Sequence, residues 1–258
     1  MRANRICFSN TALAVAFATL PAGVAVAQTI PEDVPEHFYR AELVILEQRV
    51  NPADVEEQMA GKPVEPPVAS TTNLWVEGEN SSRSTDLNLV NNDQLHLNRA
   101  TQRLERSGNY RVLATAGWYQ SFPPDYDSGP MRVAIGDWLE AAGQRAIEGH
   151  INIERQRYLH VDINLNHWQV DEAALEEARA AAQAEALAVT ENQDEITQED
   201  GNNQSQQGAE AEPASLAPVD PELLTWIRET RRMRSGEIHF IDSPTIGVLV
   251  YFEPIEQE

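Results

Sequence analysis

A run of alternating apolar and polar residues in the middle of the chain constrains its fold more than any other feature. The run is IEGHINIERQRYLHVDINLNHW, residues 147–168, and its alternating apolar members are Ile151, Ile153, Leu159, Val161, Ile163 and Leu165. Alternation with a period of two is typical of a strand with one buried and one solvated face. The two arms are separated by a few polar residues, and together they predict an antiparallel hairpin within a sheet.

The alternation also restricts the register of this hairpin, because a one-residue slip would turn every apolar side chain to the other face. A three-residue loop at residues 155–157 keeps both apolar sets on one face, whereas a two-residue loop does not. This register places His150 opposite Asp162 and Asn152 opposite His160 on the outer face. Two histidines and a carboxylate invite a metal-site interpretation. Ordinary cross-strand pairs on a wet face explain them more simply, so we expect no metal.

Several other segments have the composition of strands. Strands are expected at residues 38–49, 110–120, 223–231, 237–242 and 246–252, with a short extended piece near 133–135 inside an otherwise irregular 122–144 stretch. The first and the last of these strands are apolar at consecutive positions, so both of their faces must be covered. Residues 51–92 carry several prolines and few apolar side chains, and are expected to be irregular.

One helix is expected over residues 92–107. Asn92 and Asp93 can cap its first turn, and Gly108 follows its last turn. Its apolar stripe consists of Leu97, Ala100 and Leu104, and its charged face of Arg99, Arg103 and Arg106. A helix that covers one sheet face would explain the two doubly apolar strands. The predicted fold class is therefore α+β, a mainly antiparallel sheet of six to seven strands with one covering helix and a long acidic insertion.

The acidic insertion is the segment 171–220, which separates the last three strands from the others. It holds 13 Asp or Glu residues and a single basic residue, Arg179. Its first part is rich in helix formers, and its second part, 190–218, has the Gln, Asn, Glu and Gly content of a disordered loop. We interpret it as an insertion within one domain spanning residues 28–258. A linker between two domains is the alternative, but the residues that follow are too few for a second core.

The first 27 residues have the three parts of a secretory signal peptide. Arg2 and Arg5 supply the positive start, residues 12–20 the apolar centre, and residues 25–27 a small-residue cleavage site. The single cysteine, Cys7, lies in this segment, so the mature chain would have neither a thiol nor a disulfide. No later segment is long and apolar enough to span a membrane. The sequence thus predicts a soluble protein outside the cytoplasm, exported by a cleaved signal peptide.

The chain is strongly acidic, with a net charge of −22, or −24 once the two signal-peptide arginines are removed. A surface of this sign does not neutralise phosphates, so general nucleic-acid binding and adsorption to anionic lipid are not expected. Against this background Arg228, Arg231, Arg232 and Arg234 lie close together near the C-terminus. They indicate either a carboxylate-bearing partner or local neutralisation of acidic neighbours on adjacent strands.

Aromatic residues next to the expected strands are of the types that stack on sugar rings, although each taken alone is more often part of a core. Arginines, in turn, bind carboxylates bidentately. Sugar and carboxylate together are the chemistry of a bacterial cell wall. The candidate ligand-binding residues are therefore Arg228, Arg231, Arg232, Arg234, Trp118, Tyr119, Trp226 and Tyr158.

Sequence motifs of enzymes are missing from the chain. It contains no GxSxG, no SxxK, no HExxH and no cysteine that could act as a nucleophile after cleavage. Asp162 and Glu229 are the carboxylates to consider for a glycosidase pair, but neither lies in a recognisable motif. We therefore expect a binding protein rather than an enzyme, with no cofactor.

Four stretches carry a resemblance to a known family. They are YRAELVILEQR (39–49), LNRATQRLERSGNYRVLATAGWYQ (97–120), IEGHINIERQRYLHVDINL (147–165) and RETRRMRSGEIHFIDSPTIGVLV (228–250). In this order they resemble the CsiV family of periplasmic peptidoglycan-binding proteins, whereas the acidic segment 171–220 is not part of the matching pattern.

This resemblance implies a non-enzymatic protein that binds peptidoglycan and supports cell-wall synthesis and cell shape. In the family, this support is thought to act through the outer-membrane lipoprotein that activates a class A penicillin-binding protein. An envelope adaptor that does not bind the wall directly is the alternative. A wall hydrolase is the less favoured one, and no family binding residues are carried over to this chain.

Overall fold

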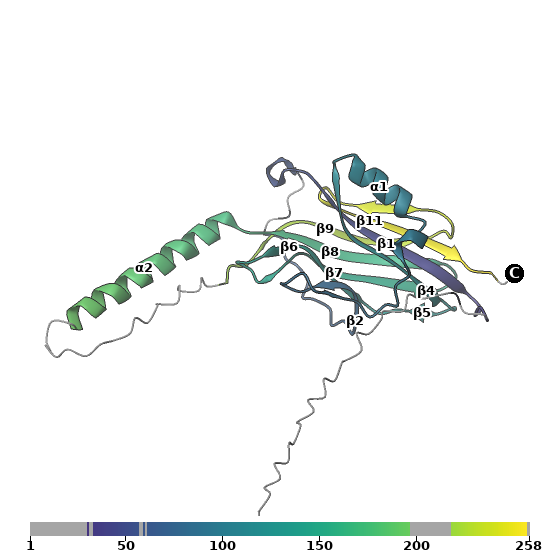
Figure 1. The fold of residues 1–258 in the computed structure, drawn as a ribbon, viewed down its shortest axis with the longest axis horizontal. Coiled ribbons are helices and arrows are strands. Elements are labelled where there is room, and N and C mark those ends of the chain that lie inside the picture. Colours follow the sequence, from purple (N-terminus) through teal and green to yellow (C-terminus); the bar gives the residue numbers. More distant parts are fainter. Residues whose placement is uncertain (1–29, 31–32, 57–58, 60, 197–217, 257–258) are drawn as a thin grey trace, which may run out of the picture.

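Two β-sheets make up most of the computed structural model, which describes residues 30, 33–56, 59, 61–196 and 218–256 (Figure 1). Sheet A has the strand order β10 (His239–Asp242), β11 (Ile246–Pro254), β1 (Phe38–Gln48) and β4 (Tyr110–Ser121). Sheet B has the order β3 (Arg83–Ser84), β2 (Thr72–Glu77), β6 (Met131–Leu139), β7 (Gln144–Arg155), β8 (Leu159–Gln169) and β9 (Glu222–Arg232), and β5 (Tyr126–Asp127) pairs with β7. All described pairings are antiparallel except β2 with β6. The predicted class, α+β with a mainly antiparallel arrangement, is confirmed.

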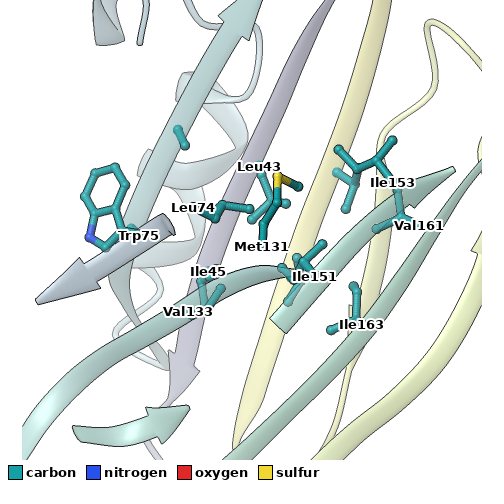
Figure 2. Close-up of a cluster of buried hydrophobic side chains, with 14 of the residues drawn as sticks. Leu43, Ile45, Leu74, Trp75, Met131, Val133, Ile151, Ile153, Val161 and Ile163 are labelled. Carbon is teal, nitrogen blue, oxygen red and sulfur yellow. The ribbon is translucent and has the colours of Figure 1, made fainter. Parts of the chain in front are cut away.

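The two sheets pack face to face around one large apolar core. Every second residue of the strands points inward, as the alternating pattern predicted for β7 and β8. Figure 2 shows Leu43 and Ile45 of β1 in the same buried cluster as Ile151, Val161 and Ile163 of sheet B. Each of these side chains is at most 1% exposed, and burial of one such side chain contributes about 1.5–3 kcal/mol. This core makes the two sheets a sandwich.

A single short helix, α1 (Asn98–Arg106), covers the outer face of sheet A (Figure 1). Val44, Leu46, Leu249 and Tyr251 on that face form a second apolar cluster with Leu97, and Ala100 and Leu104 pack against it. β1 and β11 are therefore buried on both faces, and the expected helical cover is confirmed.

The start of α1 differs from the prediction. The helix begins at Asn98, and residues 92–94 form a separate 3₁₀ turn. No side chain caps the helix locally; instead, the buried carboxylate of Glu42 on β1 accepts hydrogen bonds from the backbone N–H groups of His96 and Leu97, each at 2.9 Å. A carboxylate there satisfies N–H groups that have no intrahelical acceptor and interacts favourably with the positive end of the helix. Because Glu42 and His96 lie 54 residues apart in the sequence, the residues next to the helix give no sign of this cap.

Gly117 on β4 leaves room for the segment before α1 to lie close to sheet A. It pairs with Glu42 across β1 and β4, and its carbonyl accepts from the N–H of Val90 at 2.8 Å. A Cβ atom at Gly117 would lie 2.2 Å from a methyl group of Leu95. Any larger residue would therefore force the buried Leu95 and Val90 side chains to shift.

Two segments that were expected to be irregular contain strands, so those predictions are wrong. Residues 51–92 include β2, which was masked by the prolines and polar residues around its short Leu74-Trp75 centre. Residues 122–144 include β6, of which only the centre was predicted. Gly136, at φ +89°, lies where the β6–β7 register shifts, and it interrupts the sequence pattern. The described chain thus has eleven strands in two sheets rather than six to seven in one.

The β7–β8 hairpin has the expected three-residue loop, but the loop spans residues 156–158 rather than 155–157. Arg155 pairs with Leu159, so His150 lies opposite Asn164 and Asp162 opposite Asn152. The predicted register was therefore wrong by two residues. Parity alone cannot distinguish the two registers, because a shift of two keeps the same side chains on the same face.

The acidic segment leaves the sandwich between β8 and β9. It begins with α2 (Glu172–Ile196), which extends away from the sandwich (Figure 1). β8 and β9 pair up to the end, where Gln169 lies opposite Glu222 and donates a 2.8 Å hydrogen bond to its carboxylate. The expected signal peptide and most of the expected 190–218 loop lie outside the described residues.

Replacing Glu42 with alanine tests the cap. The variant leaves two buried N–H groups without an acceptor and removes one of the two carboxylates that bind Arg40. We expect Glu42→Ala to lower the free energy of unfolding by about 3 kcal/mol, measured by urea titration. Glu253→Ala removes the more exposed carboxylate of the same arginine and should cost less than about 1 kcal/mol. Equal effects of the two changes would refute the cap.

Removing the acidic segment tests whether it is an insertion. Since residues 169 and 222 are paired neighbours, deleting residues 172–217 with a short Gly/Ser link should leave the sandwich folded. The loss should stay within about 2 kcal/mol, mainly from the buried side chain of Leu175. Differential scanning calorimetry of the deletion variant checks this. A variant without a cooperative unfolding transition would show that the segment belongs to the fold.

Candidate functional site

The outer face of sheet B carries no helix in the described part of the chain (Figure 1). Its outward side chains are polar or aromatic, and strand pairing arranges them in rows across β7, β8 and β9. The rows are Glu148–Asn166–Trp226, His150–Asn164–Arg228, Asn152–Asp162–Thr230 and Glu154–His160–Arg232. A face lined by amides, charged groups and a tryptophan is suited to a polar ligand rather than to another packed layer.

A proline-rich segment crosses this face and turns part of it into a groove. The N–H of Met59 donates to the carbonyl of Leu224 on β9 at 3.1 Å. Farther along the segment, the hydroxyl of Ser70 bonds the carbonyls of Thr72 and Pro130, beside β2 and β6. Between these two anchors the segment and the sheet enclose a cavity of about 390 Å³. Its lining residues are Val64, Glu65, Pro66, Pro67, Val68, Ser70, Arg132, Val133, Gln144, Glu148, Gly149, His150, Asn164, Asn166 and Trp168. We call this cavity the groove.

Gly149 on β7 forms part of the groove lining. A Cβ atom there would lie 2.0 Å from the carbonyl oxygen of Asn164 on β8. Its φ of +153° is also one that residues with side chains rarely adopt. Glycine therefore keeps the two strands in register at the place where the groove needs an unobstructed wall.

Burial changes the ionisation of two groove residues. It raises the pKa of the Glu148 carboxyl, and the nearby Arg132 guanidinium offsets part of this effect. Burial also lowers the pKa of His150; Asp162 acts in the opposite direction, and Arg228 adds to the lowering. The His150 imidazole is therefore neutral at neutral pH, when it can both donate and accept hydrogen bonds.

Arg228 and Trp226 lie in the middle of β9, the edge strand of this face. The Arg228 guanidinium lies 4.9 Å from the centre of the Trp226 ring and donates to the Asn166 side chain at 2.6 Å. Lys62 lies over the same ring at 5.8 Å. Burial lowers the pKa of Arg228, while the carboxylates of Glu65 and Asp162 act against this. The result is an oriented cation beside an indole ring.

The structure separates the eight predicted binding residues into three groups. Arg228 and Trp226 lie beside the groove. Arg232, Arg234 and Tyr158 lie together at the tip of the β7–β8 hairpin, where Arg232 stacks on the Tyr158 ring at 4.0 Å. The two groups occupy different parts of the molecule because Trp226 and Arg228 lie in the middle of β9, whereas Arg232 is its last residue.

The remaining three predicted residues are engaged elsewhere. Arg231 points to the inner side, where it pairs with Glu229 at 2.6 Å and donates to the Phe240 carbonyl of sheet A at 2.7 Å. It thus bridges the two sheets at the open edge of the sandwich. Trp118 is only 3% exposed in the main core, and Tyr119 is 8% exposed and stacked on Phe38. Their side chains are not offered to a ligand, so we do not carry these two into the site.

Most residues of the groove were not predicted from the sequence. Arg132 was assigned to a loop, and the segment 61–70 showed only prolines and a lack of apolar residues. For the β8 residues a signal existed: Asn164, Asn166 and Trp168 share the parity of the outer face. That parity identifies a polar face, but only the crossing segment makes a cavity of it.

The described residues were compared with two further kinds of feature, a metal-binding cluster and a membrane-spanning helix. Among the described residues no three His, Cys, Asp or Glu side chains cluster in a way that could hold a metal ion. The described helices include none that is long and apolar enough to cross a membrane. The two carboxylates considered for catalysis are both bonded: Asp162 accepts from Thr230 at 2.6 Å, and Glu229 pairs with Arg231.

Comparison with known proteins gives one assignment. No curated protein and no solved structure matches the chain. Residues 10–255 match the family described as "Peptidoglycan-binding protein, CsiV". The match runs through both sheets, α1 and the acidic segment, and so covers the whole sandwich. The chain therefore belongs to the CsiV family of peptidoglycan-binding proteins.

Proposed function

We propose that this protein is a non-enzymatic peptidoglycan-binding accessory of cell-wall synthesis, and that the groove on sheet B holds the glycan. It acts in the periplasm after removal of its signal peptide, and it supports cell shape through the outer-membrane lipoprotein that activates a class A penicillin-binding protein. The membership in a peptidoglycan-binding family carries this proposal. The chemistry of the groove supports its location.

An amino sugar has an apolar ring face and a rim of hydroxyl and amide groups. The groove offers matching groups: the ring of Trp168, the side-chain amides of Asn164 and Asn166, and the neutral imidazole of His150. Aromatic rings provide large apolar contacts, and amides both donate and accept hydrogen bonds. Its volume of about 390 Å³ is in the usual range for small-ligand pockets.

The charges near the groove also suit the stem peptides that are attached to the glycan. Stem peptides carry carboxylates, and the groove region presents Arg132 and Arg228 as cations. Arg228 is held by Asn166 and Trp226, so little side-chain freedom is lost when it binds a carboxylate.

A second surface suits the adaptor function. Beside α1 lies a hollow of about 320 Å³ lined by Leu95, His96, Arg99, Ala100, Arg103 and Ile238. Ile238 is 44% exposed, which is unusual for a large apolar side chain. A protein partner such as the lipoprotein would find there an apolar contact flanked by two arginines, on the sandwich face opposite to the groove.

Wall binding by the groove is tested by sedimenting the mature protein with purified sacculi. We expect the wild type to pellet with the sacculi. The double variant Trp226→Ala, Arg228→Ala should bind them at least about tenfold more weakly, since Trp and Arg dominate binding energies. Arg99→Ala, Arg103→Ala is the matched control, because it removes two exposed arginines from the α1 side and should pellet like the wild type.

The same variants separate wall binding from adaptor function. Partner binding, measured with the purified lipoprotein, should weaken in the α1 variant and persist in the groove variant. Wild-type protein that stays in the supernatant at low salt, yet binds the lipoprotein, would favour the adaptor alternative and overturn the wall-binding proposal.

Absence of catalysis is tested on the same sacculi. Prolonged incubation with the mature protein should release no soluble muropeptides above a buffer blank, as measured by liquid chromatography. Release that disappears in an Asp162→Asn variant would instead identify a hydrolase and refute the non-enzymatic proposal.

A further inference from the structure

A concentration of arginines lies at the tip of the β7–β8 hairpin, away from the groove. A hollow of about 300 Å³ opens there at the end of the sandwich. Its lining residues are Tyr39, Arg155, Arg157, Tyr158, Leu159, Arg232, Met233, Arg234 and Ser235. Four of these nine residues are arginines and none is acidic. We call this hollow the arginine pocket.

Most of these cations lack a counter-charge. Within the described residues, Arg155, Arg157 and Arg232 make no ion pair, whereas Arg234 lies 3.6 Å from the exposed carboxylate of Glu237. Like charges gathered in one hollow repel one another, and a bound anion relieves that repulsion. The chain has a net charge of −22, so a high overall content of basic residues does not explain this cluster of arginines.

Tyrosine rings and backbone contacts hold the guanidinium groups in place. Arg232 and Arg157 lie 4.0 and 5.4 Å from the centre of the Tyr158 ring. Arg155 lies 5.6 Å from the Tyr39 ring and donates to the Phe122 carbonyl at 2.8 Å. Planar guanidiniums that stack on rings keep their N–H edges free for a carboxylate or phosphate.

The floor of the pocket is apolar and firmly held. Leu159 and Met233 are only 5% and 3% exposed, so the guanidiniums stand at the rim of the apolar core. The N–H of Met233 donates to the Leu159 carbonyl at 2.8 Å, which fixes the end of β9 against β8.

We propose that the arginine pocket is a second binding site, separate from the groove, which takes the carboxylates of a wall stem peptide. This inference rests on the proposed function, because peptidoglycan supplies such carboxylates along every glycan strand. Arg232 lies six residues beyond Trp226 on β9, or about 20 Å at about 3.3 Å per residue. A polymer with repeated peptides can occupy both sites at once, and the second contact then gains from a high effective concentration.

Calorimetric titration of the mature protein at low ionic strength tests this inference, with three probes. These are a synthetic stem peptide with free carboxylates, the same peptide with its carboxylates amidated, and a tetramer of N-acetylglucosamine. We expect the free-acid peptide to bind and the amidated peptide not to bind. The double variant Arg157→Ala, Arg232→Ala should bind the acidic peptide about tenfold or more weakly than the wild type and bind the tetramer with unchanged affinity.

The control variant is Arg99→Ala, Arg103→Ala, which removes the same number of exposed arginines elsewhere and should bind the acidic peptide normally. All variants should keep the wild-type melting temperature, because Arg157 and Arg232 are exposed. Equal binding of the free-acid and amidated peptides would overturn the inference. So would binding of inorganic phosphate with no binding of the peptide, which would assign the pocket to a phosphate ligand.

Failure of this inference and failure of the groove proposal give different results. If the tetramer binds and the acidic peptide does not, the arginine pocket is refuted together with carboxylate binding by Arg132 and Arg228, and glycan binding in the groove stands. If the acidic peptide binds through Arg157 and Arg232 and the tetramer does not bind, the groove proposal fails and the pocket stands. Salt adds a further check, since the peptide contact should weaken steeply with ionic strength and the tetramer contact only slightly.

Discussion

The buried carboxylate of Glu42 decides which sheet surface this protein can use. It binds the N–H groups of His96 and Leu97 and so fixes α1 on sheet A, over Val44 and Leu46. Without this cover, the outer face of sheet A would expose a continuous apolar surface, including Val44, Leu46 and Leu249. With α1 covering sheet A, the polar outer face of sheet B is the sheet surface that stays accessible to a ligand. A contact between β1 and a distant helix therefore determines where function can be placed.

The sequence was sufficient for those parts of the fold that depend on local periodicity. The alternation from Ile151 to Leu165 predicted the hairpin, its buried face and its wet face, because side-chain direction in a strand depends on parity alone. The two-sided apolarity of 38–49 and 246–252 likewise required a cover, and the stripe of Leu97, Ala100 and Leu104 supplied it. These inferences needed no knowledge of which strands are neighbours.

What could not be predicted depends on approaches between distant segments. The division into two sheets, the cap at Glu42 and the crossing segment that closes the groove all join residues far apart in the sequence. The candidate site shows the same limit. Parity along β9 places Trp226, Arg228 and Arg232 outward and Arg231 inward, and this could have been inferred from the inward Ile227. It could not be inferred that Arg228 and Arg232 lie at two separate places on the surface. Arg155 and Arg157 come close to Arg232 only because of the β7–β8 hairpin.

The two proposed sites share one rigid support, and this has a mechanical consequence. β8 and β9 are paired over their whole length, from the rim of the groove to the arginine pocket, so the spacing of the sites is fixed. A flexible link would let each site bind alone, whereas a fixed spacing favours a ligand whose own groups repeat at that distance. Glycan strands carry sugars and peptides in a regular repeat and can reach both sites, whereas an isolated sugar or peptide can reach only one. The sandwich would therefore distinguish the assembled wall from its soluble fragments by geometry, even if each single contact is weak.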